Sequence, residues 1–289
     1  MNRWQGQNTS SGSRMAVGVD GGELAVEVLA GTTEPVLAIH GVSSHRRLWN
    51  WLRAESPDLT LIAPDLRGRG DSVDVKGPSS IDQHADDLVK VLDATGLDAV
   101  QVCGMSMGGF VAINLASRYP SRVKSLILVD GGFPMATPPG LTREMVPAVF
   151  ADRLGRLEQT WDSIDDFLAY FVSNTAPMLD PADPLLRDYL EHDLRDGKVR
   201  LSGEALVSDA TDIFFGAELW ESVQQPIRFL HAEWSIGSGS PPAYPPEAVE
   251  RYAPRTLATV FVPKLDHAAC IMTPAGAKAT AVVIADALA

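Results

Sequence analysis

The stretch that decides the fold is Cys103-Gly104-Met105-Ser106-Met107-Gly108-Gly109. It follows a short apolar run at 99–103 and precedes a helical pattern that Pro120 ends. A sharp turn from a strand into a helix forces its central residue into a strained backbone conformation, and small flanking residues let the helix pack close to the sheet. The sequence therefore predicts a nucleophile elbow that presents the Ser106 hydroxyl at a helix N-terminus, where negative charge is favoured.

Strand and helix patterns alternate on both sides of this turn. Two strand patterns around Gly21-Gly22 predict an opening hairpin, and Ser80 with Gly96 marks the start and stop of a helix at 81–95. The expected strands are 15–20, 24–29, 35–40, 59–63, 99–103, 123–129, 226–231 and 258–263, and a final helix is expected at 275–288. Such alternation predicts an α/β fold with a mostly parallel, doubly wound sheet.

The alternation stops at Gly131 and resumes near Pro226. Between them the sequence is mostly helical, which predicts a helical cap over 131–225 inserted into a core formed by 15–130 and 226–289. The cap carries 17 acidic and 7 basic residues, a net charge of −10 out of −13 for the whole chain. Residues 1–14 are polar and rich in Gly and Ser, so we expect a disordered tail there.

Composition and charge restrict the partners. The net charge of −13 argues against nucleic acid and anionic membrane surfaces and leaves a small neutral or cationic apolar substrate. No secretory signal or membrane-spanning run is recognisable, so we expect a cytoplasmic monomer or homodimer. Metal-binding spacings such as C-x-x-C are missing, and Gly68-Arg69-Gly70 lacks the third glycine of a dinucleotide fingerprint, so no metal and no cofactor is expected.

His267 is the best candidate for a general base. It follows the last expected strand, at the carboxyl edge where open α/β sheets place their ligands. A serine that transfers acyl groups needs such a base within hydrogen-bond reach, and a carboxylate that fixes the imidazole tautomer. The remaining histidines outside the loop after the third strand, which are His84, His192 and His231, are expected to be packed or solvated.

Four segments together resemble the α/β-hydrolase superfamily, from about Val17 to the C-terminus. They are the elbow, His40-Gly41-Val42, the turn Asp65-Leu66-Arg67-Gly68-Arg69-Gly70-Asp71-Ser72, and Leu265-Asp266-His267. The resemblance implies an oxyanion hole formed by the backbone N–H groups of Val42 and Met107. We expect His40 to support that loop, and Ser43 and His45 to line the mouth of the pocket.

The triad acid departs from the family pattern. The family usually keeps its acid after the seventh strand in a G-x-x-D segment, where this chain has Ala232-Glu233-Trp234-Ser235. Two carboxylates remain open. Asp130 ends the strand that follows the elbow helix, a position that some family members use, and Glu233 lies two residues before the vacant position. We favour Asp130 and keep Glu233 as the alternative.

The resulting hypothesis is a serine hydrolase that acts on a small carboxylic ester through a Ser106-His267-Asp130 triad and an acyl-enzyme. Hydrolysis of C–C bonds, lactones or amides is run by relatives with the same triad, so these reactions remain alternatives. A cofactor-free perhydrolase and a small-ligand receptor without turnover are further alternatives. Nucleophile chemistry based on a carboxylate is disfavoured because the elbow carries Ser106.

Overall fold

The structure is a computed structural model that describes residues 12–135 and 139–289. Most of the expected tail, 1–11, lies outside the described residues. The expected boundary of the core is wrong by two residues, because the first strand begins at Ser13 rather than at Met15. Ser13 and Arg14 pair with Val28 and Glu27 in the opening hairpin, so backbone hydrogen bonding orders them despite their polar side chains.

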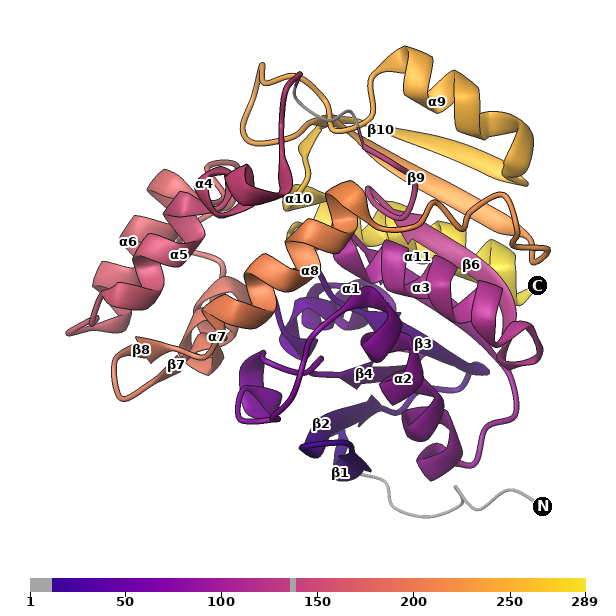
Figure 1. Ribbon diagram of the computed structural model, residues 1–289, viewed down its shortest axis with the longest axis horizontal. Helices are drawn as coiled ribbons and strands as arrows, with labels where there is room; N and C mark the ends of the chain where they lie inside the picture. Colours follow the sequence, from indigo (N-terminus) through magenta and orange to yellow (C-terminus); the bar gives the residue numbers. More distant parts are fainter. Residues whose placement is uncertain (1–11, 136–138) are drawn as a thin grey trace.

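One large sheet organises the chain (Figure 1). Its eight strands lie in the order β1-β2-β4-β3-β5-β6-β9-β10. Strand β2 is antiparallel to both of its neighbours, β1 and β4. The six strands β4, β3, β5, β6, β9 and β10 run parallel to one another. The strands are β1 (Ser13–Val19), β2 (Gly22–Leu29), β3 (Pro35–Ile39), β4 (Thr60–Pro64), β5 (Val100–Met105), β6 (Val123–Val129), β9 (Ile227–Trp234) and β10 (Ala258–Asp266). The expected doubly wound α/β sheet is confirmed.

Helices cover both faces of this sheet. The core helices are α1 (Asn50–Glu55), α2 (Ile81–Thr95), α3 (Met107–Arg118), α9 (Pro246–Tyr252), α10 (Ala269–Met272) and α11 (Pro274–Leu288). Helices α2 and α3 pack together, with α3 against β3, β5 and β6, whereas α1 and α11 pack together, with α11 against β5, β6, β9 and β10. All residues of β5 are buried as a result, which explains its continuous apolar sequence.

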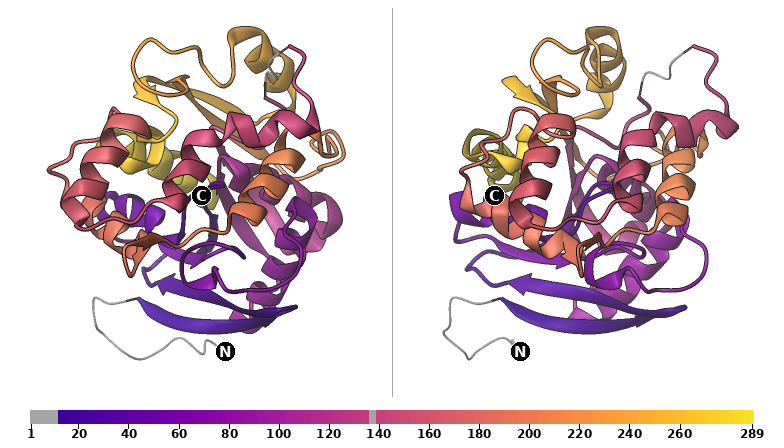
Figure 2. Two further views of the ribbon diagram at one scale, coloured as in Figure 1. Left: turned by 60° about the vertical axis from the view of Figure 1, so that its left-hand side comes forward. Right: turned by 90° about the vertical axis from the view of Figure 1, so that its left-hand side faces the viewer.

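The segment between β6 and β9 is helical, as the sequence predicts. Its helices are α4 (Val146–Val149), α5 (Ala151–Glu158), α6 (Ile164–Asn174), α7 (Pro184–Asp193) and α8 (Gly203–Phe215). Figures 1 and 2 show α4 to α7 grouped beside the sheet, and α8 packs against α2 and α3. The segment also holds a short hairpin of β7 (Leu194–Arg195) and β8 (Lys198–Val199), which turns at Asp196 and Gly197, both at positive φ.

Candidate active site

Ser106 lies in the turn between β5 and α3. Its backbone is strained, with φ 56° and ψ −123°, and its N–H donates to the Val129 carbonyl at 3.0 Å. The glycines around it are required because a larger side chain would clash with the neighbouring backbone. A Cβ on Gly104 would lie 2.2 Å from the Gly108 carbonyl oxygen, and one on Gly108 would lie 2.0 Å from that of Ile39. This close packing holds the turn in the geometry of a nucleophile elbow.

The Ser106 hydroxyl is free to meet a ligand. Ser106 is the N-cap residue of α3, yet within the described chain its side chain makes no capping hydrogen bond. The residue is partly exposed, whereas Met105 and Met107 beside it are buried. The N-terminus of α3 directs its unpaired N–H groups toward this position, which favours negative charge there.

Asp130 and His267 form a hydrogen-bonded pair. His267 Nδ1 donates to Asp130 Oδ2 at 2.6 Å, which leaves His267 Nε2 as the acceptor nitrogen of the ring. Asp130 Oδ1 accepts from the Ala232 N–H at 3.1 Å. The Asp130 side chain is 1% exposed and that of His267 is 28% exposed. The pair therefore has a buried, fixed carboxylate and an imidazole that solvent can reach.

Asp130 lies close to Ser106 because the two residues follow adjacent strands, and both have strained backbones. Asp130 has φ 45° and directly follows β6, the strand next to β5. A Cβ on Gly131 would lie 2.1 Å from the Ser106 carbonyl oxygen, so the two turns are in close backbone contact. Two of the non-glycine residues at positive φ are thus Ser106 and Asp130, which is where strain is expected if both act in chemistry.

The alternative acid has a different partner. Glu233 Oε2 accepts a hydrogen bond from the Lys264 N–H at 2.7 Å, at an irregularity of β10 where Lys264 has φ 60°. Asp266, next to His267, accepts from the Gly237 N–H at 2.8 Å and the Ala269 N–H at 3.0 Å. These two carboxylates stabilise the backbone around β10, and the contact with His267 belongs to Asp130.

The loop after β3 lies against Ser106. A Cβ on Gly41 would lie 3.2 Å from the Ser106 Cβ. His40 Nδ1 donates to the Gly41 carbonyl at 2.8 Å, while its Nε2 accepts from the Leu66 N–H at 3.0 Å. This requires a neutral ring, and burial lowers the pKa of His40 to about 4. Because the Gly41 carbonyl and the Val42 N–H belong to one planar peptide, His40 also orients that N–H.

The expectation for the pocket mouth is wrong for His45. Its side chain is 1% exposed and stacks on Tyr189 of α7 with ring centroids 4.1 Å apart. Neither ring nitrogen has a hydrogen-bond partner among the described residues, and burial lowers its pKa well below the ordinary value. Apolar packing under α7 explains the burial. Ser43 is partly exposed, and its carbonyl accepts from Arg156 Nη2 at 3.3 Å.

His45 belongs to a group of side chains that has the composition of a metal site. The ligand atoms of His45, Asp65 and His192 all lie within 4.8 Å of one another. Arg46, from the 3-10 helix η1 (Arg46–Trp49), is already among them, because its guanidinium contacts Asp65 and lies 3.1 Å from His192 Nε2. A metal ion would have to displace this cation. These are the described residues best able to hold a metal, although no sequence spacing joins them.

The sequence also did not reveal a second Ser-His-Asp group. Ser79 Oγ lies 2.9 Å from both carboxylate oxygens of Asp209, and His84 Nε2 lies 2.9 Å from Asp209 Oδ2. Arg69 Nη1 pairs with the same oxygen at 2.5 Å. The four side chains come from the turn after β4, from α2 and the loop before it, and from α8, so only the folded chain brings them together.

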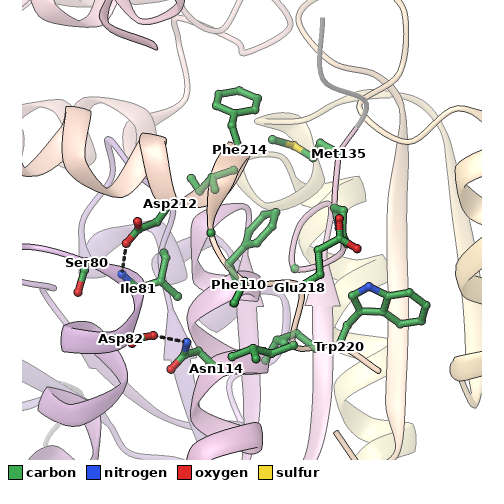
Figure 3. A pocket seen from close by; sticks show the side chains of 17 residues that line it. Ser80, Ile81, Asp82, Phe110, Asn114, Met135, Asp212, Phe214, Glu218 and Trp220 are labelled. Carbon is green, nitrogen blue, oxygen red and sulfur yellow. Dashed lines mark hydrogen bonds between the residues drawn. The ribbon is translucent and has the colours of Figure 1, made fainter. Parts of the chain in front are cut away.

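A cavity of about 390 Å³ opens beside the elbow helix, between α3, the start of α2 and the end of α8 (Figure 3). Phe110, one turn after Ser106, and Gly132, two residues after Asp130, both line it. Its larger polar and aromatic side chains are Asp82, Asp212, Glu218, Phe110, Phe214 and Trp220. Among the described residues that line the cavity there is no Lys, Arg or His, so its charge is negative.

Part of this site lies in a segment that matches a known family. A family model of the α/β-hydrolase fold matches residues 34–160, which include β3, the elbow and Asp130. The chain has the α/β-hydrolase fold. It is similar to lipase LipV of Mycobacterium tuberculosis, with 40% identity over 116 residues, which is 40% of this chain and 43% of LipV. The match thus spans less than half of LipV.

Two further proteins resemble this chain over more of its length. A Bacillus subtilis protein, provisionally named 2-succinyl-6-hydroxy-2,4-cyclohexadiene-1-carboxylate synthase, is 28% identical over 234 residues, which is 78% of this chain and 79% of that protein. The solved structure of E-2-(acetamidomethylene)succinate hydrolase superposes with a TM-score of 0.75 and 22% identity, covering 95% of this chain and 98% of that one. This second likeness establishes the fold alone.

In residues 12–135 and 139–289, no helix combines the length and the apolar character that a membrane span needs.

Proposed function

We propose that this chain is a serine hydrolase that cleaves a small carboxylic ester through a covalent acyl-enzyme. The observation that carries the proposal is the 2.6 Å hydrogen bond between His267 Nδ1 and Asp130, beside a strained Ser106 with an unengaged hydroxyl. A buried carboxylate that fixes one nitrogen of an imidazole leaves the other nitrogen available as a base. Ser106 is then the nucleophile that this base activates.

The reaction proceeds in two balanced halves. Ser106 Oγ attacks the carbonyl carbon of the ester, and its proton passes to His267 Nε2. The bond from that carbon to the alcohol oxygen breaks, and the alcohol leaves with the proton from His267. Water then attacks the acyl carbon while one of its protons passes to His267 Nε2. The bond from that carbon to Ser106 Oγ breaks, the carboxylic acid leaves, and the proton returns from His267 to Ser106 Oγ. Asp130 stays ionised throughout and stabilises the imidazolium.

The oxyanion in each half binds the backbone N–H groups of Val42 and Met107 in this proposal. Two features support the assignment: Met107 is the first residue of α3, and His40 fixes the peptide that contains the Val42 N–H. Preorganised donors of this kind stabilise the developing charge because they need no reorientation during the reaction. Removal of one such donor typically costs about 100-fold to 1,000-fold in kcat.

We further propose that residues 131–225 act as a cap, and that the substrate is neutral or cationic with an apolar acyl part. The net charge of −10 over this segment supports this. The cavity beside Phe110 adds carboxylates and aromatic rings near the elbow helix, although Ser106, Asp130 and His267 are not among the residues that line it. Burial, together with the charges of Asp209 and Asp82, raises the pKa of Asp212 in that wall. An anionic substrate would be repelled by these groups, whereas a cationic one would be attracted.

Turnover of p-nitrophenyl acetate, butyrate and octanoate tests the proposal. We expect hydrolysis with a burst of p-nitrophenol that matches the enzyme concentration, and loss of both in Ser106→Ala. Ser117→Ala, at the far end of α3, is the matched control and keeps full activity. An ester that carries a carboxylate is expected to react more slowly than its neutral analogue. Absence of turnover with a correctly folded protein would refute the proposal and favour a receptor.

A further inference from the structure

A single buried arginine connects the helical segment to both residues of the proposed oxyanion hole. The Arg69 side chain is 0% exposed. Its Nε donates to the Val42 carbonyl at 3.0 Å, and its Nη2 lies 4.0 Å from the Met107 sulfur. Its Nη1 pairs with Asp209 of α8 at 2.5 Å. One rigid guanidinium therefore contacts α8, the loop after β3 and the start of α3 at the same time.

We propose that Arg69 is a positioning residue that makes the geometry of the oxyanion hole depend on the placement of α8 through Asp209. The inference rests on the proposed function, because it assigns a use to the Val42 and Met107 amides. Arg69 lies between Gly68 and Gly70, both at positive φ, so the glycines shape the turn and the arginine side chain is left to make these contacts.

Val42 is held on both of its peptide planes. His40 fixes the carbonyl of the peptide before Val42, and Arg69 fixes the carbonyl of the peptide after it. Rotation of the peptide that carries the Val42 N–H would break the contact with His40, and a shift of the next peptide would break the contact with Arg69. The second contact depends on the position of Arg69, since a planar guanidinium that is pulled at one nitrogen moves at all three.

The ion pair with Asp209 holds the Arg69 guanidinium in its position. A fully buried guanidinium needs a charged partner, because an unpaired charge in the interior is very unfavourable. Ser79 and His84 contact the same carboxylate, and His84 belongs to α2 in the core. Burial alone would raise the pKa of Asp209, but Arg69, His84 and Ser79 together lower it, so the carboxylate is ionised at neutral pH.

Another buried pair in the same turn provides a matched control. Arg67 pairs with Asp87 of α2 through Nε at 2.8 Å and Nη2 at 3.0 Å, and both side chains are at most 3% exposed. The Arg67 side chain donates to Asp20, Lys76, Pro78 and Asp87, and it makes no hydrogen bond with Val42 or Met107. The Arg67 carbonyl accepts from Arg69 Nη1 at 2.8 Å, so only the backbone of Arg67 contacts Arg69. Asp87→Asn therefore breaks a comparable ion pair whose guanidinium does not contact the oxyanion residues.

The experiment compares Asp209→Asn with Asp87→Asn in the full-length protein. We expect Asp209→Asn to lower kcat on p-nitrophenyl butyrate about 10-fold to 100-fold with KM changed less than about threefold, and to weaken inhibition by a trifluoromethyl ketone in parallel. We expect Asp87→Asn to keep kcat within about threefold. Equal effects of the two variants on kcat and on inhibitor binding would overturn the inference.

A second readout separates this inference from the proposed function. Amide chemical shifts of Val42 and Met107 in ¹⁵N-labelled protein need no turnover. We expect them to move in Asp209→Asn and to stay in Asp87→Asn. If wild type lacks esterase activity but the shifts move, the proposed function is wrong and the connection through Arg69 stands. If wild type is active and the shifts do not move, the connection is refuted.

Discussion

The chain contains two groups of the same three residue types in very different surroundings. Asp130 and His267 come from the carboxyl ends of β6 and β10, beside Ser106 at the end of β5, and His267 is 28% exposed. Ser79, His84 and Asp209 lie between α2 and α8, with His84 and Asp209 at 0% exposure. The first group is open to a ligand, whereas the second is sealed.

The hydroxyl groups explain why the difference matters. Ser79 Oγ is already engaged, because both oxygens of Asp209 lie 2.9 Å away, and Ser106 Oγ makes no capping bond within the described chain. Asp209 is further neutralised by Arg69, whereas Asp130 has His267 as its charged or polar side-chain partner. Residue types alone therefore do not define a catalytic group. Our proposal rests instead on a serine hydroxyl that is unengaged and lies at an accessible strand end.

The largest effect is expected from the two serines. We predict that Ser106→Ala lowers kcat on p-nitrophenyl butyrate by about 10⁴-fold to 10⁶-fold, because the nucleophile is removed. Ser79→Ala is predicted to keep kcat within about tenfold, because Ser79 contacts no reacting atom. Steady-state kinetics on purified, folded protein checks both. A comparable loss in the two variants would erase the distinction between the groups.

The next effect concerns the acid. We predict that Asp130→Asn lowers kcat by about 10⁴-fold, since an amide no longer fixes the productive tautomer of His267. Glu233→Gln is its control, predicted to stay within about threefold because the amide oxygen can still accept from the Lys264 N–H. The measurement is kcat at pH 8. The reverse ranking would make Glu233 the triad acid.

The sealed group is expected to act on stability instead. Ser79→Ala removes a hydroxyl donor from a buried carboxylate, so we predict a loss of about 1–3 kcal/mol in the free energy of unfolding. Urea denaturation monitored by tryptophan fluorescence measures it. Ser117→Ala, at a partly exposed position where the hydroxyl lies 2.9 Å from that of Ser222, is expected to change the same quantity by less than about 0.5 kcal/mol. A loss below that value for Ser79→Ala would show that the group contributes little to folding.

A smaller effect with a definite sign concerns pH and His40. Its pKa is about 4 in the folded chain against an ordinary 6.5, so the unfolded chain binds more protons between these values. Stability from the neutral ring is therefore full above pH 6.5 and is lost as pH falls toward 4. Between pH 7 and pH 5 the loss is about 2 kcal/mol.

The variant His40→Gln isolates this contribution, since the other buried histidines are present in both proteins. We predict that wild type exceeds His40→Gln in unfolding free energy at pH 7, and that the excess shrinks by about 2 kcal/mol at pH 5. Urea denaturation at the two pH values is the measurement. An excess that stays constant would mean that His40 does not titrate between them.

Local signals made much of the fold predictable. The helix α2 begins and ends where Ser80 and Gly96 predict, because the Ser80 side chain caps it and Gly96 adopts φ 71°. The elbow was also predictable, since its glycines avoid steric clashes with residues a few positions away and with the neighbouring strand. Sequence periodicity and turn chemistry act over such short distances, so they can be read without the tertiary structure.

Contacts between distant segments were not predictable in the same way. The choice between Asp130 and Glu233 depends on which carboxylate the irregular end of β10 leaves near His267, and no local pattern encodes that. Asp209 lies 140 residues from Arg69 in the sequence and meets it only because α8 packs on α2. His45 was misjudged for the same reason, since Tyr189 covers it from α7.

Labelling with a fluorophosphonate, followed by peptide mapping, tests the central claim most directly. The probe forms a covalent bond with an activated serine and needs no knowledge of the substrate. We predict one modified residue, Ser106, with labelling lost in Ser106→Ala, slowed strongly in Asp130→Asn and unchanged in Ser79→Ala. Modification of another serine, or undiminished labelling of Ser106→Ala, would contradict the assignment of the nucleophile.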